Sequence, residues 1–438
     1  MPPKVPPGAA VGVGPGGLSP PQDNRWGRTL KKTNPEFVQY LRTYSPKKMS
    51  RQVVKQSEII KKHFASHRGV KFLQLIGEGK HGVACVAKQQ ADPSRNPPLK
   101  EFFFVVKRSY KEGYADEILQ QEISMLKRFR GAPHILQIRD IDPNPFESMS
   151  RPTLITEYIK NNTVGNLMER LVAWEAMPVP NRLLYRFFVC LVRACIGMAF
   201  PDREYAQNEV ETFQDGWREK GMTQIMHGDM DPDNFMVGEL SPPIWEHELA
   251  PAIKLIDFGM ASIHLDLEHR DLGVSENIFG IGRIMRVFVT GNLEMDLDPE
   301  FEKVIIPTQL PGVGERLPVD ENLVGEYGQP LPKPNQAQQE AANANLPTKE
   351  ILTASSGLAL PNYPHLDNEL RALIQQCTAV DPSQRPSLPD LGTTLTEQSL
   401  RKHEWFYGTN EAIRFRETDA QIQEYSNYVL FYPEPMKH

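Results

Sequence analysis

The sequence predicts an α+β protein with two lobes, a small strand-rich lobe followed by a larger, mainly helical one. Apolar runs typical of strands, VKFLQLIGEG, VACVAK and EFFFVVKR, follow one another after residue 70 and are separated by turn-forming residues. After about residue 164 the pattern becomes helical, and in RLLYRFFVCLVRACIGMAF apolar residues surround nearly the whole helix, which indicates burial. Strands first and helices second, in a chain of 438 residues, favour two lobes of one α+β enzyme.

The N-terminal region differs in composition from the rest of the chain. Residues 1–24 are rich in proline and glycine, which is typical of a disordered tail. Residues 25–69 are predicted to form a basic helical extension, with helix starts at Asn34 and Ser50. Residues 1–70 hold 13 Lys and Arg against 3 acidic residues, so this arm can contact an anionic partner, although a solvated helix face explains the same charge.

The strand-rich N-lobe is expected over residues 70–160, where ADEILQQEISMLKRF has the pattern of an amphipathic helix and TLITEYI that of a buried strand. The C-lobe is expected over 161–404, with NIFGIGRIMRVFV as a second buried helix. Scattered prolines predict a flexible insertion at 305–362. The aromatic-rich tail, 405–438, is expected to pack on the C-lobe.

Composition narrows the class of protein. Hydrophobic residues make up 40% and charged residues 24%, close to the usual globular balance. The cysteines, which lack C-x-x-C spacing, indicate neither a disulfide framework nor a zinc site; they are Cys85, Cys190, Cys195 and Cys377. No apolar run reaches the length of a transmembrane helix, and the N-terminus lacks the apolar core of a signal peptide. We therefore expect an intracellular, cytoplasmic protein, with a nuclear location also open, and we find no specific nucleic-acid motif.

A glycine-rich stretch with Gly77, Gly79 and Gly82 lies between the first two strand-like runs. A dinucleotide-binding fold needs such glycines to open a helix, whereas here another strand follows. A glycine-rich hairpin can instead fold over phosphates, because backbone without side chains approaches closely and offers its N–H groups. An ordinary flexible hairpin would show the same pattern.

Lys107 ends the most apolar strand, FFFVVK, where an isolated buried ammonium would cost several kcal/mol. An anion is therefore expected nearby, either Glu122 in the following helix or the phosphate of a ligand. The other possibility is that Lys107 lies at the strand end and reaches water.

The stretch HGDMDPDN holds His227, Asp229 and Asn234, and Asp257 follows in LIDFG. A loop carboxylate such as Asp229 can accept a hydroxyl proton and orient the nucleophile. The amide oxygen of Asn234 and the carboxylate of Asp257 are hard oxygen ligands suited to Mg²⁺. A surface turn of capping aspartates is the alternative reading of the same residues.

These motifs resemble, in order, those of the eukaryotic protein kinase family, from about residue 70 to about residue 400. The glycines match its glycine-rich loop, VVK its V-A-I-K, Glu122 its helix-C glutamate, HGDMDPDN its H-R-D-L-K-P-E-N, and DFG is identical. NIFGIG and DPSQRPS resemble two later signatures of the family. Long insertions and a loose activation segment resemble divergent fungal kinase-like proteins.

The resemblance implies a two-lobed protein-kinase-like fold and transfer of the γ-phosphate of Mg-ATP to a Ser/Thr-type hydroxyl of a protein substrate. It implies that Lys107, held by Glu122, binds phosphates, that Asp229 positions the hydroxyl, and that Asn234 and Asp257 hold Mg²⁺. The residues it implies for nucleotide contact are Gly77, Gly79, Gly82, Lys107 and the hinge residues Thr156, Glu157 and Tyr158.

Several positions depart from the family pattern. Gly228 replaces the arginine of H-R-D, so regulation by a phosphorylated activation loop is not expected. Asp231 stands where a lysine usually faces the transferred phosphate, so we expect a slow enzyme unless a metal or the surroundings of His227 compensate. Asn277 replaces the helix-F aspartate but can still accept hydrogen bonds.

Only about 17 residues separate DFG from Asn277, and no A-P-E motif appears, so the platform that docks a peptide is shortened or missing. Arg385, whose family partner would be the missing glutamate, needs another acid, for which we predict Glu268. Two alternatives therefore remain: a small-molecule kinase, supported by H-G-D and the short segment, and a catalytically weak nucleotide-binding scaffold, supported by Asp231 and the long tails.

Overall fold

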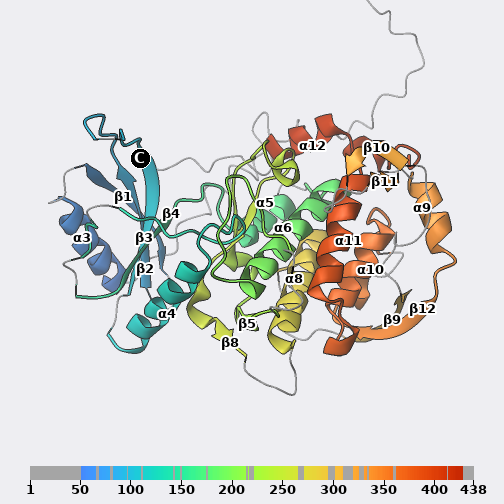
Figure 1. Cartoon of the computed structure of the whole chain (residues 1–438), viewed down its shortest axis with the longest axis horizontal. Helices are drawn as coiled ribbons and strands as arrows, with labels where there is room; N and C mark the ends of the chain where they lie inside the picture. Colours follow the sequence, from blue (N-terminus) through green and yellow to red (C-terminus); the bar gives the residue numbers. More distant parts are fainter. Residues whose placement is uncertain are drawn as a thin grey trace, which may run out of the picture.

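The computed structural model describes residues 51–427 apart from short internal segments, the longest being 265–270, 294–300 and 309–318. The chain forms two lobes side by side, a small antiparallel N-lobe and a larger helical C-lobe (Figure 1). This is the two-lobed, protein-kinase-like α+β fold that the sequence predicts. The predicted N-terminal tail and the helix start at Asn34 lie outside the described residues.

The N-lobe is one antiparallel sheet in the order β1-β2-β3-β4. Its strands are β1 (Val70–Glu78), β2 (Gly82–Gln89), β3 (Phe102–Ser109) and β4 (Thr153–Glu157). Helix α3 (Arg51–Ala65) packs on β1 and β2, on the side away from the C-lobe, and helix α4 (Tyr114–Arg128) lies toward the C-lobe (Figure 1). Phe64 of α3 packs edge-on against both Phe104 and Phe146, which anchors the helical extension to the N-lobe core.

The C-lobe is built around helix α6 (Asn181–Ala199), every residue of which is buried, as its apolar pattern predicts. Helices α8 (Leu272–Thr290) and α11 (Leu388–Arg401) pack against it. The other helices of the lobe are α5 (Val164–Ala173), α10 (Asn368–Cys377) and α12 (Asp419–Tyr425). Ile422 and Tyr425 near the C-terminus belong to the same core.

Two small antiparallel ladders hold the loops that face the N-lobe. Strand β5 (Ile225–Met226) pairs with β8 (Ser262–Ile263), and β6 (Phe235–Val237) pairs with β7 (Ile253–Leu255). The 3₁₀ turns η1 (Pro232–Asn234) and η3 (Phe258–Met260) lie next to these strands in the sequence. Because the ladders fix both ends of each loop, the polar residues of HGDMDPDN and LIDFG are brought together.

The prediction that 305–362 is simply a flexible insertion is wrong, because regular elements occupy much of its described part. Strand β9 (Glu302–Pro307) pairs with β12 (Thr348–Thr353), and Ile306 and Ile351 on them pack with Ala379. The segment between them holds β10 (Val319–Val324), β11 (Pro330–Pro332) and α9 (Gln336–Asn343). A capping box of Asn335 and Gln338 starts α9, a local signal that the scattered prolines obscured.

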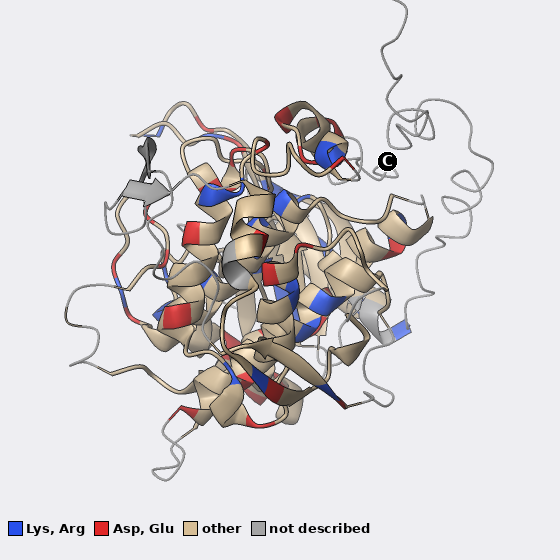
Figure 2. Ribbon diagram, turned by 90° about the vertical axis from the view of Figure 1, so that its right-hand side faces the viewer, with Lys and Arg blue, Asp and Glu red and all other residues tan. Residues whose placement is uncertain are grey.

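Charge is mixed over the C-lobe end of the molecule, where acidic and basic residues are interspersed along the ribbon (Figure 2). Most of the predicted basic arm lies outside the described residues. Within the described ranges, no helix combines the length and the apolar character needed to span a bilayer.

Candidate active site

The centre of the candidate site is an ammonium held between two carboxylates. Lys107 Nζ lies 2.7 Å from Glu122 Oε2 and 3.1 Å from Asp257 Oδ1. The exposed side-chain fractions are 26% for Lys107, 2% for Glu122 and 43% for Asp257. Glu122 is thus the partner predicted for Lys107, and Asp257 adds a second anion from the C-lobe. The cluster joins β3, α4 and the loop after β7.

Electrostatics favour the charged forms of Lys107 and Asp257. Burial acts to lower the pKa of Lys107, but the carboxylates of Glu122 and Asp257 outweigh it and the pKa is raised. Burial acts to raise the pKa of Asp257, but the Lys107 ammonium outweighs it and the pKa is lowered. The pKa of Glu122 is raised, because its burial is the largest influence and the attraction of Lys107 offsets only part of it.

The backbone of Asp257 is in the left-handed region, with φ 63° and ψ 71°. A residue with a Cβ pays about 1–3 kcal/mol in such a conformation, so the surrounding packing must hold it there. Phe258, the next residue, packs with ring centroids 4.9 Å from those of both Phe129 and His227. A Cβ on Gly259 would lie 2.7 Å from Ile118, so α4 lies directly against this loop. Residues of both lobes therefore pack against the loop and hold the strained backbone of Asp257 in place.

Asp229 and Asn234 are bonded to each other. Asn234 Nδ2 donates to Asp229 Oδ2 at 2.9 Å and to the Asp229 carbonyl at 2.8 Å. The backbone of Asn234 accepts a hydrogen bond from Ile256 N at 2.9 Å, so Asn234 sits beside the residue that precedes Asp257. The ladder of β6 and β7 therefore brings together the two residues predicted to bind metal.

His227 is buried and holds the loop rather than adding charge to it. Its Nε2 lies 2.9 Å from the carbonyl oxygen of Ile256, and its Nδ1 accepts from Asp229 N at 3.3 Å. Burial lowers the pKa of His227, so the ring is neutral at neutral pH. Asn277 Oδ1 accepts from His227 N at 3.0 Å, and Asn277 Nδ2 donates to Ile225 O at 2.7 Å. The expected hydrogen-bond acceptance by Asn277 is confirmed.

The backbone conformation explains why position 228 is a glycine, which the sequence alone does not reveal. Its φ is +78°, and a Cβ placed on it would lie 2.6 Å from the carbonyl oxygen of Met260. No side chain fits there without movement of the backbone, because the η3 loop passes directly over this position. The absence of an arginine is thus part of how the two loops pack together.

Asp231 is committed to local structure and has a basic neighbour. Its carboxylate caps η1 by accepting from Asp233 N at 2.9 Å. Burial lowers the pKa of Arg283 on α8, and the nearby Asp231 carboxylate opposes that shift. Compensation of this acid by a metal or by the surroundings of His227 stays a prediction, and Arg283 is a basic residue near enough to interact with Asp231.

The hinge residues Thr156 and Glu157 end β4, and Tyr158 follows it. Thr156 is buried and pairs with Val105 of β3. The Glu157 carboxylate accepts from Lys254 Nζ at 2.7 and 2.9 Å, so its side chain is bound to β7. The Tyr158 ring lies 6.0 Å from that of Phe103. The backbone of the segment is also engaged, because Glu157 N donates to the Gln137 carbonyl at 3.0 Å and the Glu157 carbonyl accepts from the Thr156 hydroxyl.

Two of the three loop glycines lie within the described residues. Gly77 is in β1, and Gly82 begins β2. Gly79 lies outside the described residues. A Cβ on Gly82 would lie 2.6 Å from the carbonyl oxygen of Arg108, so the hairpin packs closely on β3 at that point.

Arg385 has a different partner from the one predicted. Its Nη1 lies 2.8 Å from Glu276 Oε1, and its guanidinium lies over the ring of Phe279, 4.6 Å from the centroid. Both partners are on α8, beside the turn that carries Arg385, whereas Glu268 lies outside the described residues. The pairing of Arg385 with Glu276 depends on how α8 packs, which the sequence does not reveal.

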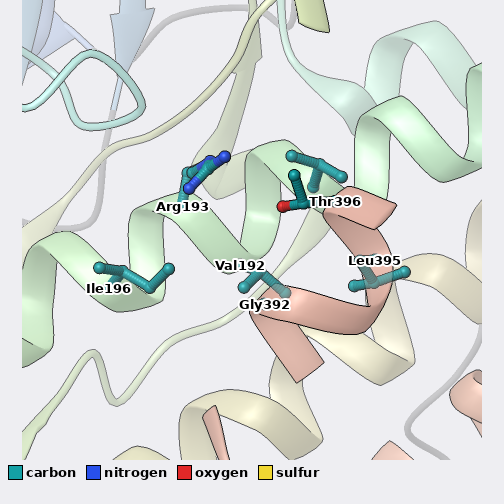
Figure 3. A pocket seen from close by; sticks show the side chains of 7 residues that line it. Val192, Arg193, Ile196, Gly392, Leu395 and Thr396 are labelled. Atoms are coloured by element: carbon teal, nitrogen blue, oxygen red, sulfur yellow. The ribbon is translucent and has the colours of Figure 1, made fainter. Parts of the chain in front are cut away.

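A small pocket between α6 and α11 is separate from this site (Figure 3). Its lining is mostly apolar and consists of Val189, Val192, Arg193, Ile196, Gly392, Leu395 and Thr396. Arg193 is already bonded to Glu246 and to the Glu211 carbonyl. The pocket therefore presents no unused group that would bind a cofactor.

Comparison with known proteins gives a distant structural likeness. No protein-family model matches the sequence, and no curated protein matches it. Among solved structures, a chain of the CAK complex from Chaetomium thermophilum, determined bound to ATP-gamma-S, is similar with a TM-score of 0.42 and 16% identity. The similarity covers 82% of this chain and 95% of that one. A likeness at this level carries no information about activity.

Proposed function

We propose that the protein is an ATP-dependent phosphotransferase of the protein kinase type, which transfers the γ-phosphate of Mg-ATP to a Ser/Thr-type hydroxyl of a protein substrate. The observation that carries this proposal is the ammonium of Lys107 between Glu122 and Asp257, across the two lobes. An ion pair that only stabilised the fold would not need to remain partly exposed, nor to include a carboxylate on strained backbone.

Each polar residue has a role in this proposal. Lys107, oriented by Glu122, binds the phosphates of ATP, and the carboxylate of Asp257 and amide oxygen of Asn234 hold Mg²⁺. When bound, Mg²⁺ neutralises charge on the phosphate oxygens. Asp229 accepts a hydrogen bond from the acceptor hydroxyl and orients it for in-line attack. The hydrogen bond from Asn234 fixes the Asp229 carboxylate in place.

A nucleotide-binding scaffold is the second candidate, and Asp231 is the observation that favours it. An acid at this position repels a transferred phosphate, although the nearby Arg283 on α8 interacts favourably with it. The small-molecule kinase has less support. A helical insertion at 201–221 lining an acceptor pocket would support it, but the described part of that segment contains no helix.

The test is transfer of labelled γ-phosphate, with and without Mg²⁺, to the protein itself, to a panel of unrelated proteins and to a panel of hydroxyl-bearing metabolites. Asp229→Ala is compared with Asp233→Ala, because Asp233 lies in the same loop but bonds to Thr163. We expect magnesium-dependent labelling of protein that falls by about 10²–10⁴-fold in Asp229→Ala and is nearly unchanged in Asp233→Ala.

The remaining outcomes separate the alternatives. Labelling of metabolites but of no protein would favour the small-molecule kinase. Magnesium-dependent nucleotide binding without any transfer would favour the scaffold. Equal turnover in the wild type and Asp229→Ala would contradict the role given to Asp229.

A further inference from the structure

A second polar cluster lies buried in the C-lobe, apart from the candidate active site. His134 in the segment after α4, Cys190 of α6 and His247 of the turn η2 (Trp245–His247) are all buried. One ring nitrogen of each histidine and the sulfur of Cys190 lie within 4.8 Å of one another. His134 Nε2 faces His247 Nε2 at 3.0 Å. Nitrogen and sulfur donors from three separate segments thus converge on one point.

The orientation of His134 is fixed from behind. Glu211 Oε2 lies 2.6 Å from His134 Nδ1, and Glu211 Oε1 accepts from the backbone N–H of His134 at 2.8 Å. A carboxylate that holds one ring nitrogen, so that the other points into a site, is the usual support of a metal-binding histidine. Glu211 is itself fully buried, and the free-energy cost of burying its carboxylate is offset only if the groups that it contacts carry positive charge.

Two buried polar atoms in this cluster have no hydrogen-bond partner among the described residues, Glu246 Oε2 and His247 Nδ1. The other oxygen of Glu246 is bonded to Arg193, at 3.0 and 2.7 Å. Its free oxygen lies 3.9 Å from His134 Nε2, the same ring nitrogen that faces His247. Leaving a buried acceptor unsatisfied costs about 1–3 kcal/mol, and a cation bound at this point would satisfy the oxygen.

We propose that His134, Cys190 and His247 form a structural zinc site, with the free oxygen of Glu246 as fourth ligand. Two imidazoles, a thiolate and a carboxylate oxygen form a donor set that Zn²⁺ binds in tetrahedral geometry. The buried charges balance, because Zn²⁺ and Arg193 offset Cys190 thiolate, Glu211 and Glu246. Full burial leaves no open position for a substrate, so the site is structural.

The site would add a metal link between parts of the C-lobe that already pack together, since Arg193 of α6 is bonded to Glu246 of η2. It connects the segment after α4, helix α6 and the long loop between β6 and β7. The His134 carbonyl accepts from Leu255 N at 2.8 Å, and Leu255 lies two residues before Asp257. The metal would therefore also stabilise the strand that carries the predicted magnesium ligand, although the zinc proposal does not depend on the proposed phosphotransferase activity.

The test uses the full chain, untagged, purified without chelator and analysed for metals. We expect about one tightly bound zinc ion per chain, and a Tm lowered by several degrees when a strong chelator removes it. Cys190→Ser should lose most of the zinc. Cys195→Ser is the matched control, because Cys195 is also buried on α6 but is not in the cluster, and it should keep its zinc.

Cobalt replacement keeps the proposal testable if Cys190→Ser fails to fold. Wild-type protein loaded with Co²⁺ should show the thiolate-to-cobalt charge-transfer band and the intense visible bands of a tetrahedral site. The absence of both bands, together with chelator-insensitive Tm and substoichiometric zinc, would overturn the proposal and leave a metal-free hydrogen-bonded cluster. Equal zinc in Cys190→Ser and Cys195→Ser would also overturn it.

Discussion

Lys107 in the N-lobe and Lys402 in the C-lobe have nearly the same immediate surroundings. Lys402 Nζ lies 2.8 Å from Asp367 Oδ2 and 2.9 Å from Glu369 Oε2, much as Lys107 lies between Glu122 and Asp257. The exposed side-chain fractions are 1% for Lys402, 3% for Asp367 and 4% for Glu369. One ammonium is therefore sealed in the core, while the other stays partly exposed where β3, α4 and the loop after β7 meet.

The groups around Lys402 explain why that cluster cannot bind a ligand. The hydroxyls of Tyr185 and Tyr407 donate to Asp367 at 2.9 and 3.1 Å, and the Phe406 ring centroid lies 4.2 Å from Lys402 Nζ. Aromatic rings and hydroxyls occupy the positions where phosphates or metal would have to enter. A lysine between two carboxylates thus indicates a binding site only when part of it stays exposed.

The largest expected effect is on stability, in the buried cluster of Lys402, Asp367 and Glu369, here called the sealed cluster. Lys402→Met leaves two buried carboxylates without a cation, which should lower the free energy of unfolding by about 3–5 kcal/mol at pH 7. Denaturant unfolding measures it. Lys160→Met is the control, because Lys160 pairs with Glu239 at the surface and should cost less than about 1 kcal/mol. Equal losses in the two variants would remove the distinction between sealed and exposed pairs.

The next effect is on turnover, in the partly exposed cluster of Lys107, Glu122 and Asp257, here called the open cluster. Lys107→Met should lower kcat of the proposed transfer by about 10²-fold or more, because the phosphates lose a directed cation. Its cost in stability should be smaller than that of Lys402→Met, since water can reach Asp257, one of the two carboxylates left behind. Turnover and unfolding are measured on the same preparations. A large stability loss with unchanged turnover would reverse the roles assigned to the two lysines.

A smaller effect is expected at Gly228, which holds the loop of Asp229 against η3. Gly228→Ala should cost about 1–3 kcal/mol of stability, from the positive φ and from the contact with the Met260 carbonyl. Gly221→Ala separates the two causes, because Gly221 has φ +71° but nothing within 4 Å of its Cβ position. If both variants lose the same stability, the contact with Met260 contributes nothing.

The smallest effect is on the pH dependence of stability, which should differ between the wild type and Lys402→Met. Burial acts to raise the pKa of Asp367 but Lys402 outweighs it, so the pKa is lowered, whereas the pKa of Lys402 is raised despite burial. In the wild type the pair contributes stability that is lost only as pH falls through the folded pKa of Asp367, below about 4, or rises above about 10. Between pH 5 and 8 this contribution is constant.

In Lys402→Met, burial without a cation should raise the pKa of Asp367 above its unfolded value. Protonation then favours the folded state, so the variant should be more stable at pH 5 than at pH 8. Thermal unfolding across this range tests it against the wild type. A variant that is least stable at pH 5 would contradict the burial of unpaired charge.

The sequence predicts the open cluster better than the sealed one, for a physical reason. Lys107 in an apolar strand needs an anion, and an amphipathic helix follows close by with Glu122, so local patterns suffice. Glu369 lies on α10, Asp367 caps the start of α10 and Lys402 follows the end of α11, and nothing in these ordinary amphipathic patterns marks the tyrosines that close the cluster. Their meeting depends on how α10 and α11 pack.

Other features of the site also depend on tertiary packing and could not be predicted from the sequence. The positive φ of Gly228 and the strain at Asp257 arise from loops packed against each other, which no spacing reveals. Cys190 lacks a neighbouring cysteine, so its meeting with His134 and His247 was not predicted from cysteine spacing. The strands in 305–362 were missed because prolines dominated the pattern, although the capping box at Asn335 and Gln338 was visible in the sequence.

The measurement that tests the central claim most directly is thermal unfolding with ATP, with and without Mg²⁺, of the wild type, Lys107→Ala, Asp257→Ala and the loop control Asp233→Ala. Nucleotide at about 100 times its Kd should stabilise the folded protein by roughly 2.7 kcal/mol, a shift of a few degrees in Tm. We predict a magnesium-dependent shift in the wild type and Asp233→Ala that is lost in Lys107→Ala and Asp257→Ala. No shift at millimolar ATP, or an equal shift in all four proteins, would contradict a nucleotide site at Lys107 and Asp257.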